Sequence, residues 1–396
     1  MISLPIYLDN HATTKPDPRV VEAMLPYFTE IYGNAASKAH EFGWKAEAAV
    51  EHARKQIAHL IGSDSHEIIF TSGATESINL AIKGAAEGYS EKGNEIISVE
   101  TEHRASLDTY KSLERKGFKI VYLKVDKHGL VNPDELLSIF NNHTILVSVM
   151  MANNEIGTIN NVNEIAAISN ERGVLFHTDA VQAAGKISIN LNNLKADMMS
   201  ISAHKMHGPK GIGALFVRSK FPKIKLKALI DGGGHERGLR SGTLNVPAIV
   251  GFGKACEICR KEMETESVII KDMRDKLEEG LTSKLDDITV NGHPEKRLYN
   301  NSNISFKGVG ADSLIMSMRE IAVSSGSACS SVSVKPSHVL KAIGLNDDLV
   351  KSSIRFGLGR FNTHEEIEYV INKVVEKVNY LRDISPAYKA KQRMNV

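Results

Sequence analysis

The sequence is poor in cysteine, with three in 396 residues. Three cysteines cannot form a disulfide framework, and so few are typical of a protein in a reducing compartment. An excess of charge of one sign is also missing, because 49 Lys and Arg face 47 Asp and Glu, which leaves a net charge of +2. A nearly neutral chain gives no support to a nucleic-acid partner, and we expect none.

Long apolar runs are missing as well. The longest stretches, such as Ile145–Ala152, contain Ser148 and are far shorter than the roughly 20 residues of a membrane helix. The first residues, MISLPIYLDN, show neither the basic nor the apolar region of a signal peptide. We therefore expect a cytoplasmic protein with no membrane partner.

The composition is that of a globular protein, with 42% apolar and 24% charged residues. A single hydrophobic core rarely serves more than about 250–300 residues, so this length predicts two domains.

The first two thirds of the chain alternate strand-like and helix-like patterns. Short apolar runs rich in Val, Ile or Phe predict strands at Glu67–Thr71, Glu95–Val99, Lys119–Val125, Thr144–Met151, Val174–His177 and Asp197–Ser202. Helical patterns lie between them at Glu76–Ala86, Ser106–Lys116 and Val162–Arg172. This alternation indicates an α/β fold with a parallel sheet covered on both faces. A further run, Gly213–Val217, follows too closely for a crossover helix and predicts an antiparallel addition to the sheet.

The pattern changes after residue 250. A long charged helix is expected at Gly253–Leu285 and would link two domains. The remainder mixes a short strand at Asn303–Phe306 with a helix at Glu365–Leu381, which is an α+β pattern. The last residues, from about Ser385, have no periodicity and are expected to be mobile.

Polar residues follow five of the predicted strands. Ligands of open α/β sheets bind beyond the carboxyl ends of the strands, so we expect these side chains at one rim. Each group alone has an ordinary explanation, such as helix capping for Ser72–Thr75 or a salt bridge for Asp179. The groups, in chain order, are Ser72–Glu76, Glu102 with His103, Asn153–Glu155, Asp179 with Gln182, and His204 with Lys205.

The set as a whole fits pyridoxal phosphate. That cofactor needs a lysine for a Schiff base and an acid for its ring nitrogen, and Lys205 and Asp179 meet these needs. The start of the helix after Ser72–Thr75 offers backbone N–H groups for a phosphate. His103 can cover the ring. Neither a Walker loop nor the Gly-x-Gly-x-x-Gly fingerprint of dinucleotide-binding proteins occurs.

The three cysteines fall into two kinds. Cys256 and Cys259 form a Cys-x-x-Cys pair inside a predicted helix, without the second pair that a structural zinc site needs. A buried position is the simplest interpretation for them, and a redox pair is the alternative. Cys329 lies in a Ser- and Gly-rich loop, Ser324–Ser333. Free cysteines are usually buried, so Cys329 is either an incidental exposed thiol or a mobile nucleophile.

Two arginines stand in turns with glycine and hydroxyl residues. Arg240 precedes Ser241-Gly242-Thr243, and Arg355 lies within Ser353–Gly357. A guanidinium group binds a carboxylate through two hydrogen bonds, so these arginines are either anion ligands or members of structural ion pairs.

The motifs together resemble the cysteine desulfurases, pyridoxal-phosphate enzymes of aminotransferase class V and fold type I. The resemblance runs along nearly the whole chain, and the cysteine loop is similar to that of the long-loop branch, which includes the nitrogen-fixation and housekeeping iron–sulfur enzymes. The motifs are Tyr7–Thr14, Thr71–Ser77, Glu102-His103, Asn153–Gly157, His177–Gln182, Ser202–Lys205, Arg240–Thr243, Ser325–Cys329 and Pro336–Leu340.

The resemblance implies a fold and a domain organisation. The large domain would hold a seven-stranded, mostly parallel mixed sheet and span residues 15–259. The small α+β domain would combine residues 1–14 with residues 260–396.

It also implies roles for single residues. Lys205 would carry the cofactor and move protons, Asp179 would pair with the ring nitrogen, and Gln182 with the phenolic oxygen. His103 would stack on the ring and help in proton transfer, and Cys329 would attack the substrate sulfur. The remaining cofactor contacts would be Gly73, Ala74, Thr75, Asn154, Ser202 and His204, with Thr243 from the other subunit of a homodimer. The substrate carboxylate would be held by Asn154, Arg355 and Asn34.

The implied reaction converts L-cysteine to L-alanine and leaves a persulfide on Cys329, supplying sulfur for iron–sulfur cluster assembly. The implied partner is an iron–sulfur scaffold protein or another sulfur acceptor. No resident metal is expected, and whether Cys329 ligates a transient cluster stays open. The alternatives are a selenocysteine lyase or another lyase with this cofactor, a sulfur donor for tRNA thiolation, and a sulfur-handling binding module. The sequence departs from the family at Ala35, where proline often follows the Gly-Asn pair.

Overall fold

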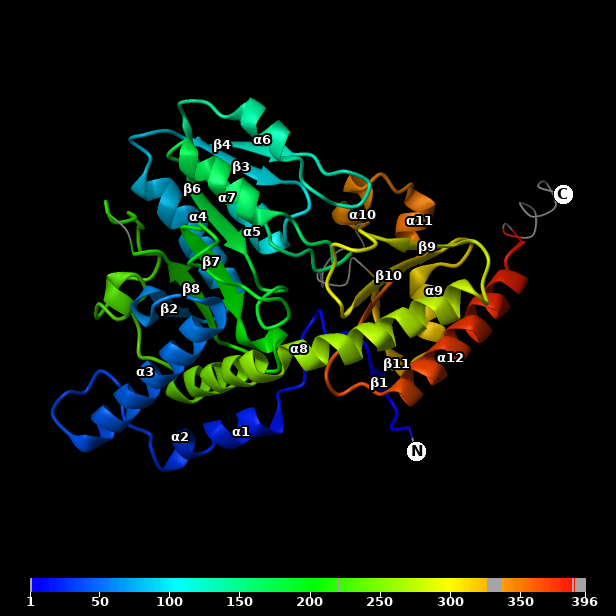
Figure 1. Ribbon diagram of the computed structural model, residues 1–396, viewed down its shortest axis with the longest axis horizontal. Helices are drawn as coiled ribbons and strands as arrows, with labels where there is room; N and C mark the ends of the chain where they lie inside the picture. Colours follow the sequence, from blue (N-terminus) through cyan, green and yellow to red (C-terminus); the bar gives the residue numbers. More distant parts are fainter. Residues whose placement is uncertain (1, 220, 326–335, 387, 389–396) are drawn as a thin grey trace.

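The computed structural model describes residues 2–219, 221–325, 336–386 and 388. Two lobes lie side by side, and helix α8 (Val246–Thr282) runs through both of them (Figure 1). The sequence predicted this helix at Gly253–Leu285. It begins earlier because Asn245 caps it and Pro247 occupies its first turn, where the missing proline N–H costs nothing.

The larger lobe is built on a seven-stranded sheet in the order β2-β8-β7-β6-β5-β3-β4. Neighbouring strands from β7 to β4 are parallel, and β8 runs antiparallel to both β2 and β7. This sheet and the antiparallel strand confirm the predicted fold class. The strands are β2 (Ile68–Thr71), β3 (Glu95–Val99), β4 (Lys119–Leu123), β5 (Thr144–Ser148), β6 (Leu175–Asp179), β7 (Met198–Ser202) and β8 (Gly213–Val217).

Some predicted strand ends were wrong by a few residues. The run predicted to end at Met151 stops as strand β5 at Ser148, where the pairing with β3 ends at Ser98. The chain still follows β6 beyond that point, with Met151 N–H donating to Asp179 O at 2.9 Å. The apolar residues therefore continue beyond the paired part of β5, and the residues that follow them lie at the rim of the sheet.

Alternating strand residues face two separate apolar cores. Ile97, Val147 and Phe176 lie in one core, and their neighbours Ile96, Leu146 and Leu175 lie in the other. Successive side chains of a strand point to opposite faces, so burial of both faces produces the continuous apolar runs seen in the sequence.

The helices of this lobe divide between the two cores. Helices α4 and α5 contribute to one, whereas α3, α7 and the first half of α8 contribute to the other. The short α1 and α2 pack against α8. The helices are α1 (Pro18–Met24), α2 (Pro26–Thr29), α3 (Glu41–Ile61), α4 (Ala74–Gly88), α5 (Arg104–Glu114), α6 (Pro133–Ile139) and α7 (Val162–Glu171).

The smaller lobe holds a four-stranded antiparallel sheet in the order β12-β13-β10-β9 and a two-stranded parallel pair, β1 and β11. The sequence predicted only β10 and α12 here, because the other strands are short. The elements are β1 (Ile6–Tyr7), β9 (Ile288–Asn291), β10 (Asn301–Phe306), α9 (Ala311–Ser317), β11 (Ile321–Ala322), β12 (Ser324–Ser325), α10 (His338–Ala342), α11 (Asp347–Lys351), β13 (Ser353–Gly357) and α12 (His364–Asp383).

We propose the domain division that the sequence indicates, with a boundary near residue 259 in α8. Cys259 packs in a core of the larger lobe, whereas Ile270 packs in the core of the smaller lobe. Ile6 and Leu8 share that second core, so the N-terminal strand returns to the C-terminal third.

The packed part of the chain extends a few residues beyond Ser385, where the sequence predicted that a mobile tail begins. Tyr388 is buried, and its hydroxyl donates to Asp287 Oδ2 at 3.1 Å. The rest of the expected tail, residues 389–396, lies outside the described residues.

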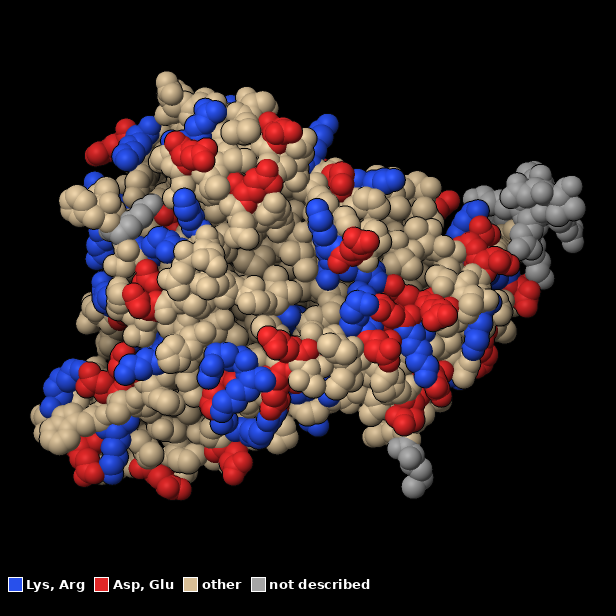
Figure 2. Space-filling model, viewed as in Figure 1, with Lys and Arg blue, Asp and Glu red and all other residues tan. Residues whose placement is uncertain are grey.

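The surface carries both signs of charge. Lys and Arg are interspersed with Asp and Glu over the face in Figure 2, in keeping with the net charge of +2. In the part of the chain that the structure describes, every helix is too short or too polar to traverse a lipid bilayer.

The contact between α3 and α8 yields a stability prediction. A Cβ on Gly253 would lie 2.6 Å from Ala53 Cα, a backbone atom that cannot move aside. Gly253→Ala is therefore expected to lower the free energy of unfolding by about 1–3 kcal/mol, despite the better helix propensity of alanine. Thermal unfolding of the purified protein measures this effect.

Gly280 in the same helix supplies the control. A Cβ there would meet side-chain atoms of Ile371 and no backbone atom, so Gly280→Ala should lower the thermal midpoint less than Gly253→Ala does. Equal effects at the two positions would contradict the close packing of α3 on α8.

Candidate active site

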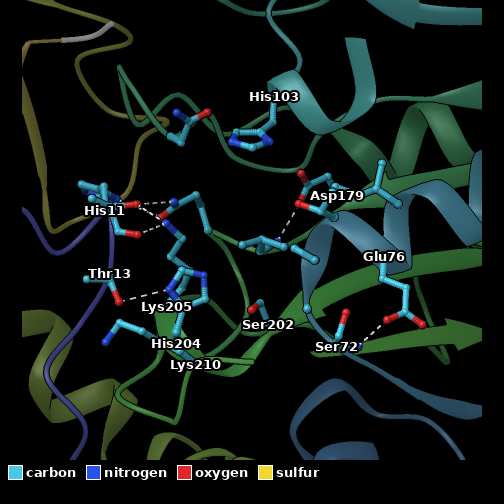
Figure 3. A pocket seen from close by; sticks show the side chains of 18 of the residues that line it. His11, Thr13, Ser72, Glu76, His103, Asp179, Ser202, His204, Lys205 and Lys210 are labelled. Carbon is cyan, nitrogen blue, oxygen red and sulfur yellow. Dashed lines mark hydrogen bonds between the residues drawn. The ribbon is translucent and has the colours of Figure 1, made fainter. Parts of the chain in front are cut away.

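A cavity of about 580 Å³ opens beyond the carboxyl ends of β6 and β7, at the start of α4 (Figure 3). The sequence predicted this rim as a binding site. The segment after β1 also reaches the cavity, through His11, Ala12 and Thr13. Predicted residues that line it are Gly73, Ala74, Thr75, His103, Asn154, Asp179, Gln182, Ser202, His204 and Lys205.

Lys205 lies in a short 3-10 turn, Ala203–Lys205, directly after β7. Its Nζ donates to the carbonyl oxygens of His11 and Ala12, each at 2.5 Å. Two carbonyl oxygens of the N-terminal segment therefore orient the Lys205 amine. The turn is tight, because Gly208 N–H donates back to Ala203 O.

Asp179 is the last residue of β6 and is buried. Its Oδ1 accepts from Val181 N–H at 2.9 Å. Burial raises the pKa of the carboxyl from 3.8 to about 6, against the opposing effects of that N–H and of Lys205. A buried carboxylate of this kind is stabilised when a cation docks beside it.

Gln182 and His11 form a reciprocal pair. Gln182 Nε2 donates to His11 O at 3.0 Å, and its Oε1 lies 2.9 Å from His11 Nδ1. Burial holds the pKa of His11 well below its ordinary value, so the ring is neutral, and its one hydrogen faces either Gln182 Oε1 or Asn300 O, which lies 3.2 Å from Nε2. The pair fixes the Gln182 carboxamide and leaves its second amide hydrogen for a ligand.

His103 caps α5 and faces the cavity. Its Nδ1 accepts from Ala105 N–H at 3.1 Å, and burial, with Lys205 and His338, lowers its pKa to about 4. The neutral ring therefore carries its hydrogen on Nε2. In this arrangement His103 is a flat, uncharged surface with an N–H donor.

The start of α4 can hold a phosphate. The first N–H groups of a helix have no partner within it, and the N-cap residue here is Gly73, which makes no side-chain cap. Gly73 has φ 153° and ψ 179°, which suit glycine, and a Cβ there would meet no atom within 4 Å. The backbone is therefore open to an anion, and Thr75 lies at its edge.

Ser202 and His204 complete this side of the cavity. Ser202 ends β7, and His204 Nδ1 lies 3.1 Å from Thr13 Oγ1. Burial and Lys205 lower the pKa of His204 to about 4, so the ring is neutral near pH 7. The donors present, a helix start, a hydroxyl and a neutral imidazole, together fit a phosphate group.

Arg355 on β13 lies behind the cavity wall and does not line the cavity itself. Its NH1 donates to Asn154 O at 2.9 Å and its NH2 pairs with Asp9 Oδ1 at 2.8 Å. Its Nε is buried with no hydrogen-bond partner among the described residues. A buried guanidinium with an unused donor fits the predicted role of carboxylate ligand.

Two predicted residues lie elsewhere in the single chain. Asn34 and Thr243 are both exposed and do not line this cavity. Cys329 and most of its loop lie outside the described residues. Cys256 and Cys259 are buried, as the sequence suggested, and burial raises the pKa of both thiols.

Sequence reasoning missed the roles of several buried polar residues. His11 and Glu102 stood in quoted motifs but were given no role. Burial, with a contribution from Asp179, raises the pKa of Glu102 to about 8, and its Oε1 accepts from Met150 N–H. Lys186 is buried and donates to the backbone oxygens of Gln182 and Lys205 at 3.1 and 3.2 Å. A charged residue in an apolar stretch was the available signal for Lys186.

These features define a fold-type I enzyme that uses pyridoxal phosphate, and comparison with known proteins agrees. The aminotransferase class-V family matches residues 6–370, and the chain belongs to that family. Pyridoxal 5′-phosphate is accordingly its cofactor.

Within this family the similar proteins are cysteine desulfurases. The chain is 54% identical over 387 residues to "Cysteine desulfurase IscS" of Anaeromyxobacter dehalogenans (strain 2CP-C), a match that covers 98% of this chain and 96% of that protein. A solved "NifS-like protein" has a TM-score of 0.88 at 39% identity and covers 95% of this chain and 99% of its own. "SspA in complex with cysteine" has a TM-score of 0.79 at 34% identity, covering 90% and 100%.

The raised pKa of Asp179 yields a prediction for the cofactor-free protein. As pH rises from 3.8 to about 6, the unfolded chain ionises this carboxyl while the folded chain keeps it protonated, so stability falls through that window. Above pH 6 the loss is complete and amounts to about 3 kcal/mol. Asp179→Asn cannot ionise and should escape this loss.

Unfolding of the two cofactor-free proteins between pH 4 and pH 8 tests this expectation. The variant should gain stability relative to the wild type as pH rises, whatever the cost of its amide at pH 4. A difference that stays constant with pH would show that the Asp179 charge is not buried. The same variant should bind pyridoxal phosphate more weakly, because it cannot pair with the ring nitrogen.

Proposed function

We propose that the protein is a cysteine desulfurase that converts L-cysteine to L-alanine and transfers the sulfur to Cys329 as a persulfide. The observation that carries the proposal is the grouping of Lys205, Asp179 and His103 around one cavity with an anion site. The full-length similarity to cysteine desulfurases supports L-cysteine as the substrate. The structural neighbour SspA, which was solved in complex with cysteine, supports the same substrate. The sulfur supplies iron–sulfur cluster assembly.

Each side chain has a task that its environment allows. When bound, pyridoxal phosphate supplies an electron sink for the bonds broken at the substrate carbons. Lys205 holds the cofactor and then moves a proton at the substrate α-carbon. Asp179 would keep the ring nitrogen protonated, and Gln182, held by His11, would have its remaining amide hydrogen for the phenolic oxygen.

His103 covers the ring and donates from Nε2, because its Nδ1 is already used by Ala105 N–H. Asn154 and Arg355 hold the substrate carboxylate, together with Asn34, which lies outside this cavity in the single chain. Gly73, Ala74, Thr75, Ser202 and His204 hold the phosphate.

The sulfur transfer balances without an outside oxidant. The Cys329 thiolate attacks the substrate sulfur, a sulfur–sulfur bond forms and the carbon–sulfur bond breaks. The electron pair of the broken bond stays on carbon, which takes a proton and leaves as alanine. A thiol reductant then releases the outer sulfur as sulfide and is oxidised to a disulfide, whereas a protein acceptor thiol takes this sulfur as a new persulfide and no sulfide forms.

The active form is a homodimer in which Thr243 completes the phosphate site of the partner subunit. Asn34 and Thr243 are outside the cavity of their own chain, yet they flank a shared cleft of about 440 Å³ lined by Ala35 and Leu244. Exposed Tyr32 and Phe42 stack nearby, with ring centroids 5.4 Å apart. Apolar surface beside both residues supports a second copy docking there.

The sulfur acceptor is an iron–sulfur scaffold protein, and the enzyme works in the cytoplasm.

The direct test of the function is to measure alanine and sulfide formed from L-cysteine by the holoenzyme, with and without a thiol reductant. With one equivalent of cysteine and no added reductant, about one equivalent of alanine and a persulfide on Cys329 are expected; with excess cysteine and reductant, alanine forms over many turnovers. Alanine formation without any protein persulfide would contradict the proposal.

Lys205→Ala tests the cofactor assignment. Without the amine the protein cannot hold the cofactor covalently or move the α-proton, so turnover should fall below detection and the absorbance of the bound cofactor should change or vanish. Ultraviolet–visible spectroscopy and the alanine assay measure both effects. A variant that still turns over cysteine would show that another residue has this role.

Cys329→Ala separates binding from sulfur transfer. Cysteine binding depends on the cofactor and the carboxylate ligands, so this variant should keep its cofactor and still change its spectrum with cysteine. Persulfide formation should fall by about 100-fold or more, because the nucleophile is lost. Mass spectrometry after incubation with cysteine reads the persulfide directly.

The buried cysteines are the matched controls. Cys256 and Cys259 are 0% and 1% exposed, and a buried thiol is a poor nucleophile. Cys256→Ala and Cys259→Ala should therefore keep activity within about twofold of wild type. A persulfide on either of them, with none on Cys329, would overturn the assignment.

A further inference from the structure

Helix α10 begins where the described chain resumes after residues 326–335, and it makes an unusual contact at its first turn. Its N-cap residue is Ser337, whose Oγ accepts from Leu340 N–H at 3.1 Å. The same hydroxyl donates to Glu155 Oε2 at 2.5 Å. Ser337 and Glu155 are each 5% exposed, so this is a buried polar contact.

Glu155 belongs to the loop that carries Asn154. Asn153 Oδ1 accepts from the N–H groups of Glu155 and Ile156, at 2.8 and 3.0 Å, which fixes the turn. Arg355 NH1 donates to Asn154 O at 2.9 Å. The start of α10 is thereby tied to the wall that we assign to the substrate carboxylate.

The next residue of the helix contacts the adjacent loop, which follows β3 and is joined to the loop of Asn154 by a hydrogen bond from Asn153 Nδ2 to Thr101 O at 3.1 Å. His338 Nε2 lies 2.9 Å from the backbone oxygen of Glu102, the residue before His103. A carbonyl oxygen only accepts, so His338 donates and its ring hydrogen sits on Nε2. Two successive residues, Ser337 and His338, thus link the loop of Asn154 with the loop of His103.

Capping alone does not account for this arrangement. A cap needs one acceptor atom, and the neighbouring helix α11 is capped by Asn346, which accepts from Leu349 N–H at 3.0 Å. Ser337 performs the same task and uses its hydrogen for a second one. Burial raises the pKa of Glu155 to about 7, which means that this carboxyl is held in an unfavourable place.

Apolar packing would hold α10 without these bonds. Ile156, Val339, Leu340, Ile343 and Val350 form a buried cluster of their own. Loss of either polar contact should therefore leave the helix in place. Only the position of its first turn relative to the two loops should change.

We propose that Ser337 and His338 are positioning residues for sulfur transfer, which fix the end of the cysteine-bearing segment to the two adjacent loops that carry Asn154 and His103. The proposal rests on the function proposed above. Cys329 precedes Ser337 by eight residues. Ser324 of β12 lies before that segment and is the strand partner of Arg355, which donates to Asn154 O. The residues before and after the segment are therefore both connected to the loop of Asn154.

Ser337→Gly in the full-length holoenzyme tests the first anchor. Glycine is a tolerated N-cap residue, so the change removes the hydroxyl at small cost to the helix. Asn346→Gly makes the same change at the start of α11 and is the matched control. Two quantities are measured for each: the cysteine concentration that half-saturates the spectral change of the cofactor, and the single-turnover rate of persulfide formation on Cys329.

We expect Ser337→Gly to slow persulfide formation by about tenfold or more, because small misplacements of a nucleophile have large effects on rate. The half-saturating cysteine concentration should change by less than about threefold, since the cofactor and its ligands are untouched. Asn346→Gly should match the wild type in both. Equal losses in Ser337→Gly and Asn346→Gly, or a loss of cysteine binding as large as that of the rate, would overturn the proposal.

Glu155→Met and the double variant test whether the two residues act as a pair. Methionine keeps the length of the side chain and removes the acceptor. The double variant should be no slower than the slower single variant, because one contact cannot be lost twice. Additive losses would mean that Ser337 and Glu155 act separately and would contradict the pairing.

Two substitutions at His338 test the second anchor. His338→Gln keeps an N–H donor and should restore most of the persulfide rate that His338→Leu loses. Equal rates in both variants would remove His338 from the proposal. If the wild type forms alanine but no Cys329 persulfide, the proposed function itself fails, and this outcome is distinct from every result for the variants.

Discussion

The burial of a carboxylate at the end of a central strand is the constraint on which the active site depends. Asp179 ends β6 inside the protein, where burial raises its pKa to about 6. The positive charge of Lys205 acts in the opposite direction and lowers this pKa. Glu102 is buried nearby, and Asp179 contributes to raising its pKa to about 8. Such a group destabilises the cofactor-free fold and is relieved by a cation, so the protein carries a built-in preference for a protonated ring nitrogen. The remaining features of the site, a lysine, a neutral histidine and an anion-binding helix start, are arranged around this charge.

The N-terminal segment connects that charge with the rest of the molecule. Strand β1 pairs with β11 in the smaller lobe, and the residues that follow cross to the larger lobe, where Thr14 N–H donates to His204 O. On the way, His11 holds the Gln182 carboxamide, and the oxygens of His11 and Ala12 hold the Lys205 amine. One short stretch of backbone therefore sets the positions of Gln182 and Lys205, which we propose as cofactor ligands, and joins the lobes. A movement between the lobes would reach the cofactor through this segment.

Some of the site could be predicted without the structure, for a physical reason. Lys205 and Asp179 follow strands whose apolar runs are long enough to recognise, and parallel strands bring their carboxyl ends to one edge. The start of α4 was recognisable from Ser72–Thr75 for the same reason. Asn154 also followed a predicted strand, and Arg355 stood out beside glycine and serine as a possible anion ligand, but their roles came only from the resemblance to a family, as did those of Asn34 and Thr243. Arg355 lies on β13 of the second sheet, and no local pattern relates that strand to the rim of the first.

The sequence by itself determined the α/β class, the strands of the larger lobe, helices α4, α5, α7 and α8, and the chemistry of the cofactor, because each depends on local periodicity and on residue types beside strand ends. Helices α1, α2, α3 and α6 were not predicted. The tertiary structure alone decided the contacts between distant segments. His11 and Gln182 are 171 residues apart, Ser337 and Glu155 are 182 apart, and His338 and Glu102 are 236 apart. It also decided the protonation states, since a histidine, a lysine or a carboxyl in the sequence has its ordinary pKa until burial removes water from it. Neither contact nor burial is encoded at a single position, because both arise only when the two lobes pack around one cavity.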